Sequence, residues 1–398
     1  MGKCLVCNKG RIINSLDVGM QPISNRYLCN LEDDEYMHQI VIGQCESCGL
    51  VQLINSPPYQ QLVPHFNWIT FNEPEEHLDC LVETITKLPG VKKHSRICGV
   101  SYKEDTTLKR LQTKGYLNTW KIDSIDDLGI RDRGAGIETI KGCINNTLTK
   151  KILNKHGSSD ILIARHILEH AHDPLDFMEL LKELINPDGY IIFEIPDCTS
   201  VLNHQDYSTI WEEHILYFTS ETLFSTLSYG GFDIIDYITY PYPYENSLVT
   251  IVKLNKSKDK ISIDNNILKN EKKRMHNFST GIKHKKIELR NQLLSLKNND
   301  SKIAMFGAGH LACMFINVMD LKDIIDFVVD DDVNKSGLFM PGSRLPIYGS
   351  DKLISNNIKL CLTSLSPESE TKVMENNQDY INNGGKFASI FPASKVSL

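Results

Sequence analysis

The chain has 398 residues, of which 41% are hydrophobic and 23% charged, and its formal net charge at pH 7 is -7. This length predicts two or three domains, and the acidic balance excludes a nucleic-acid groove because such grooves need clustered lysines and arginines. The sequence contains neither a signal-peptide pattern nor a run of about eighteen apolar residues. We therefore expect a cytoplasmic protein with no nucleic-acid or membrane partner, and the sequence does not indicate an oligomeric state.

The first part of the chain, residues 1–75, contains two Cys-x-x-Cys pairs in a segment that we expect to be loop-rich. Cysteines of a cytoplasmic protein stay reduced or bind metal, since structural disulfides rarely persist there. Two such pairs supply four thiolates for tetrahedral Zn²⁺, and a site with four cysteine ligands has no open position for catalysis. We predict a zinc-binding domain with a structural metal, held by Cys4, Cys7, Cys45 and Cys48.

The second part, residues 76–255, alternates short apolar runs with helical patterns. The runs are nearly continuous and rich in β-branched residues, as expected for strands that are buried on both faces of a parallel sheet. This pattern predicts an α/β domain. The runs read "RICGV", "DILIARHIL", "YIIFEIP" and "SLVTIVKL".

The last part begins with a helical connector over residues 256–300, which is rich in lysine and asparagine and contains no proline. A second α/β unit over 301–398 opens with "KIAMFGAGH". Gly307 and Gly309 follow a predicted strand, and Asp330 closes a later one. This spacing is also typical of dinucleotide-binding folds, so NAD(P) binding and an NAD(P)-dependent oxidoreductase are one alternative.

The order of several motifs resembles that of the zinc-domain-containing sugar C-methyltransferases, which act on nucleotide-linked ketosugars. The resemblance implies a central class I methyltransferase domain with a Rossmann-like fold and a second Rossmann-like domain at the C-terminus. It also implies S-adenosylmethionine as methyl donor and a nucleotide-linked small molecule as acceptor, bound between the two α/β domains. The motifs are "CLVC", "QPISNRYL", "CESCGLVQL", "ILIARHILEHAHDPLDF", "NPDGYIIFEIPD", "STIWEEHILYFTSETL" and "FVVDDDVNKSGLFMPGSRLPI".

The stretch "ICGVSYKEDTTLKRL" aligns with the donor loop of that family, which resembles "IGSNDGTLL". Only one loop glycine remains, so a side chain must occupy space that backbone normally leaves to the ligand. The resemblance makes Asp105 a partner for the donor's amino group, and Asp123 after "TWKI" a partner for the ribose hydroxyls. The predicted donor-binding residues are Gly99, Asp105, Asp123, His166 and His170.

Methylation of carbon requires a base that removes a proton beside a carbonyl and a group that stabilises the enolate. The family sequence "YHEH" is "WEEH" here, and its last histidine, His214, is the candidate base with an ordinary pKa near neutrality. Trp211 replaces the tyrosine and Glu212 the first histidine. The predicted catalytic residues are His214, Glu213 and Tyr244.

Substrate contacts are expected near this catalytic block. Glu194 closes a predicted strand, and ligands of α/β proteins collect at the carboxyl ends of strands. The family's "HGGS" segment is changed to "YENS" here, which favours an acceptor that differs from the usual ketosugar. The predicted substrate-binding residues are Asn25, Glu194, Trp211 and Asn246.

Two further alternatives stay open. His166 and His170 are four residues apart, so on one helical turn they would bind a second metal. A chain that has lost most donor-loop glycines would instead serve as a non-catalytic binding or assembly protein. We expect the methyltransferase, with S-adenosylmethionine as donor.

Overall fold

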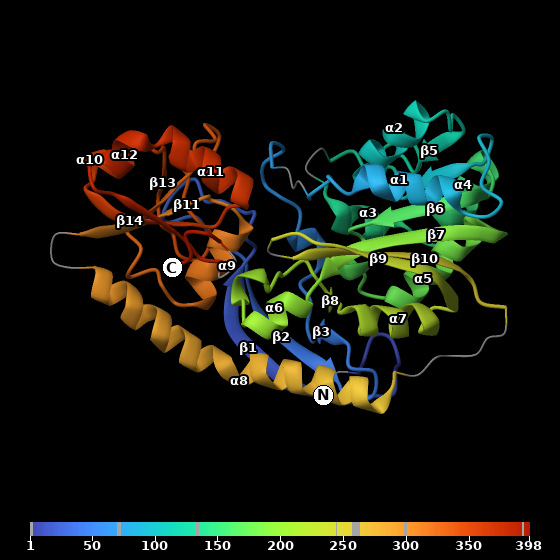
Figure 1. Cartoon of the computed structure of the whole chain (residues 1–398), viewed down its shortest axis with the longest axis horizontal. Helices are drawn as coiled ribbons and strands as arrows, with labels where there is room; N and C mark the ends of the chain where they lie inside the picture. Colours follow the sequence, from blue (N-terminus) through green and yellow to red (C-terminus); the bar gives the residue numbers. More distant parts are fainter. Residues whose placement is uncertain are drawn as a thin grey trace.

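The computed structural model describes residues 3–69, 73–132, 135–243, 245–256, 263–297, 301–391 and 394–398. Within these residues the strands form three sheets. Figure 1 shows the C-terminal sheet and the central sheet on opposite sides of the N-terminal strands β1 (Ile12–Pro22) and β2 (Met37–Cys45). The site therefore has to be sought where the three parts meet.

The N-terminal segment forms an antiparallel sheet with the order β1-β2-β3-β8, which corrects the expectation that it is loop-rich. Within β1, Leu16 and Val18 are buried and the intervening Asp17 is exposed. The strand β3 covers Val51–Leu53, whereas β8 (Leu216–Tyr217) comes from the central part of the sequence. A strand from beyond residue 75 thus completes this sheet, and the domain limits at 75, 255 and 300 stay predictions.

The central sheet contains four parallel strands extended by an antiparallel pair, in the order β5-β4-β6-β7-β10-β9. Ile161 and Ile163 pack on one face, and Leu162 and Ala164 pack on the other. The apolar runs are therefore buried on both faces, as the sequence predicts. The strands are β4 (Ile97–Gly99), β5 (Thr119–Lys121), β6 (Ser159–Arg165), β7 (Ile185–Asp197), β9 (Phe232–Tyr240) and β10 (Asn246–Leu254).

Helices cover both faces of the central sheet. The apolar residues of α1 (Leu78–Lys87) and α2 (Asp105–Thr113) join the core of one face. The other face is covered by α4 (Asn146–His156), α5 (Pro174–Glu183) and α7 (Ser220–Tyr229). Short elements stand above the carboxyl ends of the strands or beside the sheet: η1 (Tyr59–Gln61), η2 (Tyr102–Glu104), α3 (Ile137–Cys143), η3 (Leu168–His170), α6 (Thr199–His204) and η4 (Tyr207–Thr209).

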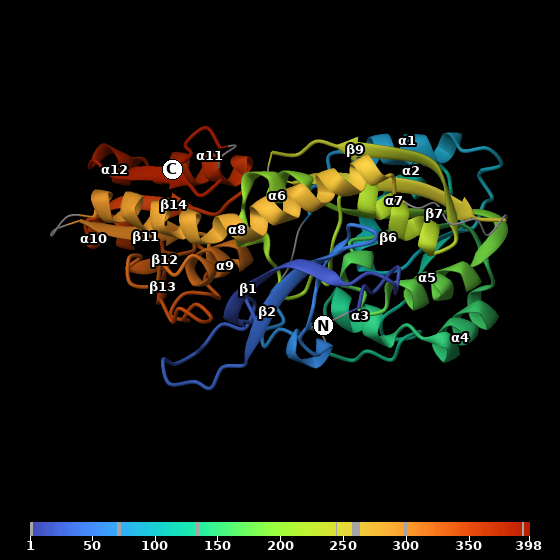
Figure 2. The same cartoon turned by 90° about the horizontal axis from the view of Figure 1, so that it is seen from below.

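The predicted connector contains one long helix, α8 (Asn265–Leu296), of 32 residues. At a rise of about 1.5 Å per residue it is about 48 Å long. Figure 2 shows it crossing from the C-terminal sheet over α6 toward α7. The side chains that it buries include Met275, Phe278 and Ile282, and Tyr207 donates a hydrogen bond to the carbonyl of Phe278 at 2.8 Å. The helix therefore ties the C-terminal part to the rest of the molecule.

The C-terminal sheet is parallel throughout, with the order β13-β12-β11-β14-β15. This is the second Rossmann-like unit that the sequence predicts. Its strands are β11 (Lys302–Phe306), β12 (Phe327–Val329), β13 (Ile347–Tyr348), β14 (Ile358–Thr363) and β15 (Lys386–Ser389). Its helices are α9 (His310–Val318), α10 (Lys352–Ser355), α11 (Pro367–Asn376) and α12 (Gln378–Asn382). In the described part of the chain, no helix combines the length and apolar character needed to cross a bilayer.

Candidate functional site

The four predicted zinc ligands meet at one end of the N-terminal sheet. The sulfurs of Cys4 and Cys48 are 3.6 Å apart, those of Cys7 and Cys45 are 3.4 Å apart, and all four lie within 4.8 Å of one another. Zn–S bonds of about 2.3 Å in a tetrahedron place sulfurs about 3.8 Å apart, so the cluster has the size of a zinc site. All four residues are buried, so this metal is structural.

Backbone geometry supports the same cluster. The amides of Ser47 and Cys48 point at the sulfur of Cys45, each at 3.4 Å, and such N–H contacts stabilise a thiolate. Gly10 packs against this sulfur so closely that an added Cβ would lie 2.3 Å from it. The glycine after the first cysteine pair therefore leaves room for the thiolate.

Most of the other predicted site residues line one cavity at the carboxyl edge of the central sheet. This first cavity encloses about 830 Å³, part of it open to solvent. Of the remaining predicted residues, Gly99, Asp105 and Asp123 do not line it, and Tyr244 lies outside the described residues. The predicted residues that line it are Asn25, His166, His170, Glu194, Trp211, Glu213, His214 and Asn246.

The first cavity is strongly acidic. Its cationic or protonatable lining groups are Lys103 and three histidines. Glu169 is 1% exposed and neither of its carboxylate oxygens has a hydrogen-bond partner, although the Nδ1 of His166 lies 3.6 Å from one of them. Such a carboxylate fits a cationic ligand, and the sulfonium and ammonium groups of S-adenosylmethionine are cationic. The acidic lining residues are Glu73, Glu138, Glu169, Glu194, Glu213 and Glu245.

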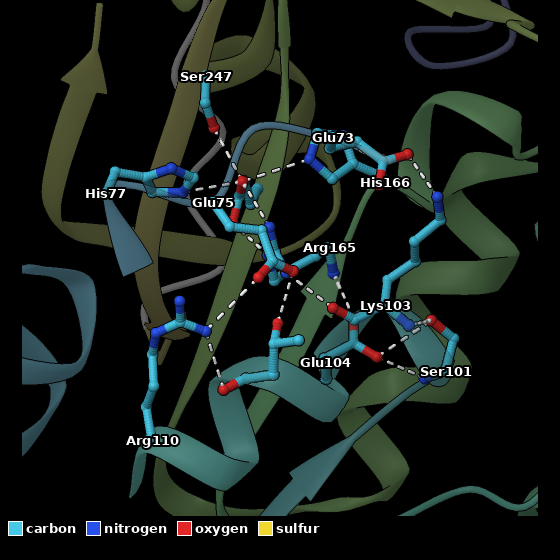
Figure 3. Close-up of polar contacts among 12 residues, drawn as sticks. Glu73, Glu75, His77, Ser101, Lys103, Glu104, Arg110, Arg165, His166 and Ser247 are labelled. Carbon is cyan, nitrogen blue, oxygen red and sulfur yellow. Dashed lines mark hydrogen bonds and ion pairs between the residues drawn. The ribbon is translucent and has the colours of Figure 1, made fainter. Parts of the chain in front are cut away.

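The donor loop is closed by one of its own side chains. The carboxylate of Glu104 accepts hydrogen bonds from the amide of Ser101 at 2.6 Å and from the amide of Arg165 at 2.7 Å (Figure 3). An added Cβ on Gly99 would lie 2.8 Å from the Cβ of Glu104, so this glycine makes room for a side chain. Complete burial raises the pKa of Glu104 to about 7. The side chain of Glu104 thus occupies space that the loop glycines of the family would leave open.

Glu194 is the centre of a buried ion-pair network, and its partners Arg165, His77 and Ser247 are labelled in Figure 3. Its carboxylate contacts the Nε of Arg165 at 2.5 Å, the Nε2 of His77 at 3.0 Å and the hydroxyl of Ser247 at 3.0 Å. Burial would raise the pKa of Glu194, but His166, His77 and Arg165 hold it well below its usual range. Although Glu194 lines the cavity, its oxygens are used to fix the edge of the sheet.

His166 and His170 do not share a helical turn, and no described metal-ligand cluster joins them. His166 follows β6 with φ +48°, and His170 ends η3. Burial would lower the pKa of His166, but the carboxylates of Glu169 and Glu194 raise it to about 10. His166 is therefore a buried cation at neutral pH, which argues against its use as a metal ligand.

The two predicted donor contacts Asp105 and Asp123 are occupied elsewhere. Asp105 is exposed at the start of α2 and forms an ion pair with Lys121 at 2.7 Å. Asp123 accepts the amides of Ile125 and Asp126, both at 2.8 Å, and so starts a turn. The structure does not bring either carboxylate to the cavity, and their contacts with the donor stay predictions.

The candidate base His214 is almost fully buried against Trp211 and His170. Its ring stacks on Trp211 with centroids 4.8 Å apart and meets His170 edge-on at 4.8 Å. No hydrogen bond joins this ring to another residue in the described ranges. Burial, together with the neighbouring His170, holds the pKa of His214 well below its usual range, which corrects the expectation of an ordinary pKa near neutrality. The ring is therefore neutral, but it is a weaker proton acceptor than a free imidazole.

The groups around His214 are ordered by hydrogen bonds. The Nδ1 of His170 lies 3.0 Å from the carboxylate of Glu138, and Asn25 donates to the carboxylate of Glu213 at 3.0 Å. Burial would lower the pKa of His170, but Glu138 raises it. Burial and the nearby Glu138 and Glu212 raise the pKa of Glu213 well above its usual range. The raised pKa values favour the protonated forms of both groups that flank the base.

Sequence reasoning missed two residues of this arrangement. Glu138 lies on α3, in a segment without a recognised motif, so no signal pointed to it. Glu169 lies inside the motif "ILIARHILEHAHDPLDF", directly before His170, and that adjacency was the available signal.

A second cavity lies between the N-terminal and C-terminal parts and encloses about 920 Å³, part of it open to solvent. Asn25 and Trp211 line both cavities. The side-chain oxygen of Asn25 is buried without a hydrogen-bond partner. The other lining residues include Ser24, Tyr27, Trp68, Gly309, His310, Asp330 and Lys335.

The glycine turn of the C-terminal unit differs from a dinucleotide site in two respects. An added Cβ on Gly307 would lie 2.7 Å from the side chain of Leu365, so protein rather than ligand occupies that space. Asp330 accepts the amide of Ala308 at 2.9 Å and the ammonium of Lys335 at 2.8 Å. Its carboxylate is thus engaged within the protein, which disfavours the NAD(P) alternative.

Comparisons with known proteins give three consecutive family matches. Residues 4–62 match a zinc binding domain, residues 75–237 match a methyltransferase domain, and residues 256–392 match a C-methyltransferase C-terminal domain. The C-methyltransferase NovU of Streptomyces niveus is 20% identical over 410 residues, covering 99% of this chain and 96% of its own length.

Two similar solved structures each cover 46% of the chain. A 1,6-didemethyltoxoflavin-N1-methyltransferase of Burkholderia thailandensis is 10% identical, with a TM-score of 0.30, and covers 46% of this chain and 78% of its own. A S-adenosylmethionine-dependent methyltransferase of Clostridium acetobutylicum is also 10% identical, with a TM-score of 0.32, and covers 46% and 93%. These scores are low, so the assignment rests on the family models.

The fold and the three domain matches define an α/β methyltransferase with a structural zinc site. The chain belongs to the zinc-domain-containing C-methyltransferase family, whose methyl donor is S-adenosylmethionine.

Proposed function

We propose that the chain methylates a carbon atom of a nucleotide-linked sugar or a related small molecule. The observation that carries this proposal is that two cavities share Asn25 and Trp211 as a common wall. An acceptor with a sugar part and a nucleotide part needs two adjoining spaces. The first cavity would hold the reacting part beside His214, and the second would hold the nucleotide part.

The donor's binding place is proposed from charge. S-adenosylmethionine supplies an electrophilic methyl group when it is bound. The carboxylate of Glu169, which has no hydrogen bond within the described residues and whose neighbouring cation His166 lies 3.6 Å away, would attract its cationic end. Because Glu104 occupies the donor loop, Asp105 and Asp123 contribute less to donor binding than the resemblance implies.

His214 is the proposed base, because its buried ring is neutral and has no hydrogen bond to another described residue. It would take the proton from the carbon beside the acceptor's carbonyl group. The cationic His170, held by Glu138 at 3.0 Å, would stabilise the negative charge that develops on the carbonyl oxygen. Asn25 would accept a hydroxyl of the acceptor through its free side-chain oxygen. Glu213 is the alternative base, and Tyr244 and Asn246 stay proposed contacts.

Calorimetry with S-adenosylmethionine, S-adenosylhomocysteine and NAD tests the donor part of the proposal. We expect micromolar binding of the two methyl-cycle compounds and no binding of NAD. A radioactive methyl-transfer assay against a panel of nucleotide-linked ketosugars then tests the acceptor. Lack of binding to all three compounds would instead favour the non-catalytic binding protein, and binding of NAD alone would favour an oxidoreductase.

A further inference from the structure

Glu212, Ser24 and His310 form a buried hydrogen-bonded chain beside the second cavity. The amide and the hydroxyl of Ser24 each lie 2.7 Å from the same carboxylate oxygen of Glu212. The hydroxyl of Ser24 also lies 2.5 Å from the Nδ1 of His310. The three residues are 0%, 1% and 8% exposed, respectively. They come from the catalytic block, the N-terminal part and α9, so the chain joins all three parts of the protein.

The hydrogen bonds among Glu212, Ser24 and His310 leave one imidazole nitrogen of His310 without a partner in the described residues. The Nε2 of His310 is buried and has no hydrogen bond within the described residues. His310 lines the second cavity at the start of α9, where an added Cβ on Gly309 would meet nothing within 4 Å. A buried polar atom beside open space is a position that a ligand atom can satisfy. The unpartnered Nε2 therefore points to a ligand contact.

Hydrogen-bond chemistry fixes the position of the His310 proton. Two donors converge on one oxygen of Glu212 at 2.7 Å, which is typical of an ionised acceptor and opposes the effect of burial and Glu138, which raise the pKa of this carboxyl. A serine hydroxyl has one proton, and if it donates to Glu212 it can only accept from His310. The Nδ1 of His310 then carries the ring proton, and the Nε2 is left as an acceptor. Stacking on Trp211, with centroids 3.9 Å apart, holds the ring in this orientation.

We propose that His310 contacts the ligand of the second cavity through its Nε2, which accepts a hydrogen bond from a ligand N–H or O–H group, and that Ser24 and Glu212 position this ring. The inference rests on the proposed function, because the ligand is the nucleotide part of the acceptor. It gives a role to Glu212, which stands where the family sequence has a histidine. The other charged groups that line the cavity are Asp330, Asp332 and Lys335.

The neutral state of His310 agrees with this role. Burial lowers the pKa of His310 to about 3, so the ring does not gain a second proton at neutral pH. Lys335 is paired with Asp330 at 2.8 Å and does not compete for the imidazole. A hydrogen-bond acceptor at this place favours ligands that present an N–H or O–H group. A ligand atom that presents a lone pair would be repelled by the Nε2 lone pair.

Nitrogen NMR of the ligand-free protein tests the proton position. Protein with ¹⁵N-labelled histidine is compared with His310→Gln, which identifies the resonances of this ring. We expect the Nδ1-protonated form in the wild type. In Ser24→Ala the Nδ1 loses its acceptor, so the ring should shift toward the Nε2-protonated form. Ser24→Thr keeps the hydroxyl and should keep the wild-type signature. Two results would overturn the positioning roles of Ser24 and Glu212. One is that His310 of the wild type carries its proton on Nε2, and the other is that the ¹⁵N signature is the same in Ser24→Ala and wild type.

Calorimetry with ADP, GDP, CDP and UDP as probes tests the ligand contact. For the probe that binds best, we expect His310→Phe to lower affinity about tenfold, because the ring stack is kept and the acceptor is lost. Ser24→Ala should weaken the same probe less, and binding of S-adenosylhomocysteine should be unchanged in both variants. Equal affinity in His310→Phe and wild type would refute the contact.

The two measurements separate this inference from the proposed function. If no probe binds the wild type, the nucleotide-linked acceptor is wrong and the ligand contact falls with it, whereas the NMR signature still decides the positioning roles. A nucleotide probe could bind while the ¹⁵N signature of His310 is the same in wild type and Ser24→Ala. In that case the nucleotide site is supported, but Ser24 and Glu212 do not position His310.

Discussion

The indole of Trp211 stacks on the imidazole of His214, with ring centroids 4.8 Å apart and planes inclined by 29°. The opposite neighbour of the indole is His310, whose centroid is 3.9 Å away. Trp211 thus forms the wall between the two cavities and touches one histidine of each. The residue that departs from the family's tyrosine is therefore a structural link between the proposed base and the proposed nucleotide site.

The stack predicts a graded response to substitution of Trp211. An aromatic pair contributes about 0.5–1.5 kcal/mol beyond its buried area, which corresponds to about a 2- to 12-fold change in rate if the stack holds the base in place. We expect Trp211→Phe to stay near the wild-type turnover and Trp211→Ala to lose about 2- to 12-fold. Steady-state methyl transfer checks this order. Equal turnover in Phe and Ala variants would show that the ring does not orient His214.

The proposed base predicts a loss of turnover without a loss of donor affinity. His214→Asn removes the proton acceptor, and the removal of a general base costs about 10²- to 10⁴-fold in rate. Donor binding does not depend on proton removal, so the dissociation constant of S-adenosylhomocysteine should stay within about twofold. His204→Asn, an exposed histidine at the end of α6, serves as the matched control. Full activity in His214→Asn would direct attention to Glu213, and then to Tyr244.

The zinc cluster predicts one metal ion per chain. Elemental analysis of protein purified without chelators should find about one zinc, and Cys45→Ser should lose it together with thermal stability, because a structural metal contributes directly to folding. Cys80→Ser is the matched control, since this exposed thiol lies outside the cluster. Metal-free wild-type protein of unchanged stability would contradict the site.

The sequence revealed the strands that are apolar on both faces, because continuous β-branched runs such as "DILIARHIL" have few other interpretations. It did not reveal the N-terminal sheet. In β1 the apolar residues are interrupted by Asn14, Asp17 and Gly19, and the pairing with β2 contains two register shifts. Irregular pairing of this kind leaves no strict alternation in the sequence from which a strand can be recognised.

The candidate site could be predicted where its residues lie in recognisable motifs, as for Glu194, His214 and Asn246, which all line the first cavity. Prediction failed for side chains that form contacts within the protein instead of facing the cavity. Asp105 faces Lys121 in solvent, and Glu104 turns inward to the amides of the donor loop. The spacing of residues along the sequence does not predict these intramolecular contacts. They depend on which buried amides lack another acceptor.

Two groups of the buried network, Glu104 and His166, each contribute stability that is lost as pH rises from weakly acidic to alkaline values, whereas His214 and His310, whose pKa values are lowered, contribute with the opposite sign. The pKa of Glu104 is raised by burial from 4.5 to about 7, and that of His166 is raised by its carboxylate partners, against the effect of burial, from 6.5 to about 10. For a group with a raised pKa, the folded state holds the proton more tightly. Its contribution to stability is therefore complete below the unfolded pKa and is lost as pH rises through the folded one.

Two variants divide this pH dependence into its parts. Glu104→Gln should remove the slope of the unfolding free energy between about pH 4.5 and 7, and His166→Gln should remove the slope between about pH 6.5 and 10. A tenfold difference in proton affinity corresponds to about 1.4 kcal/mol, so each slope is measurable by urea denaturation at a series of pH values. His284→Gln, an exposed histidine on α8, should retain both slopes. If His166→Gln keeps the wild-type slope above pH 7, His166 does not carry a tightly held proton, and its contacts with Glu169 and Glu194 are those of a neutral imidazole.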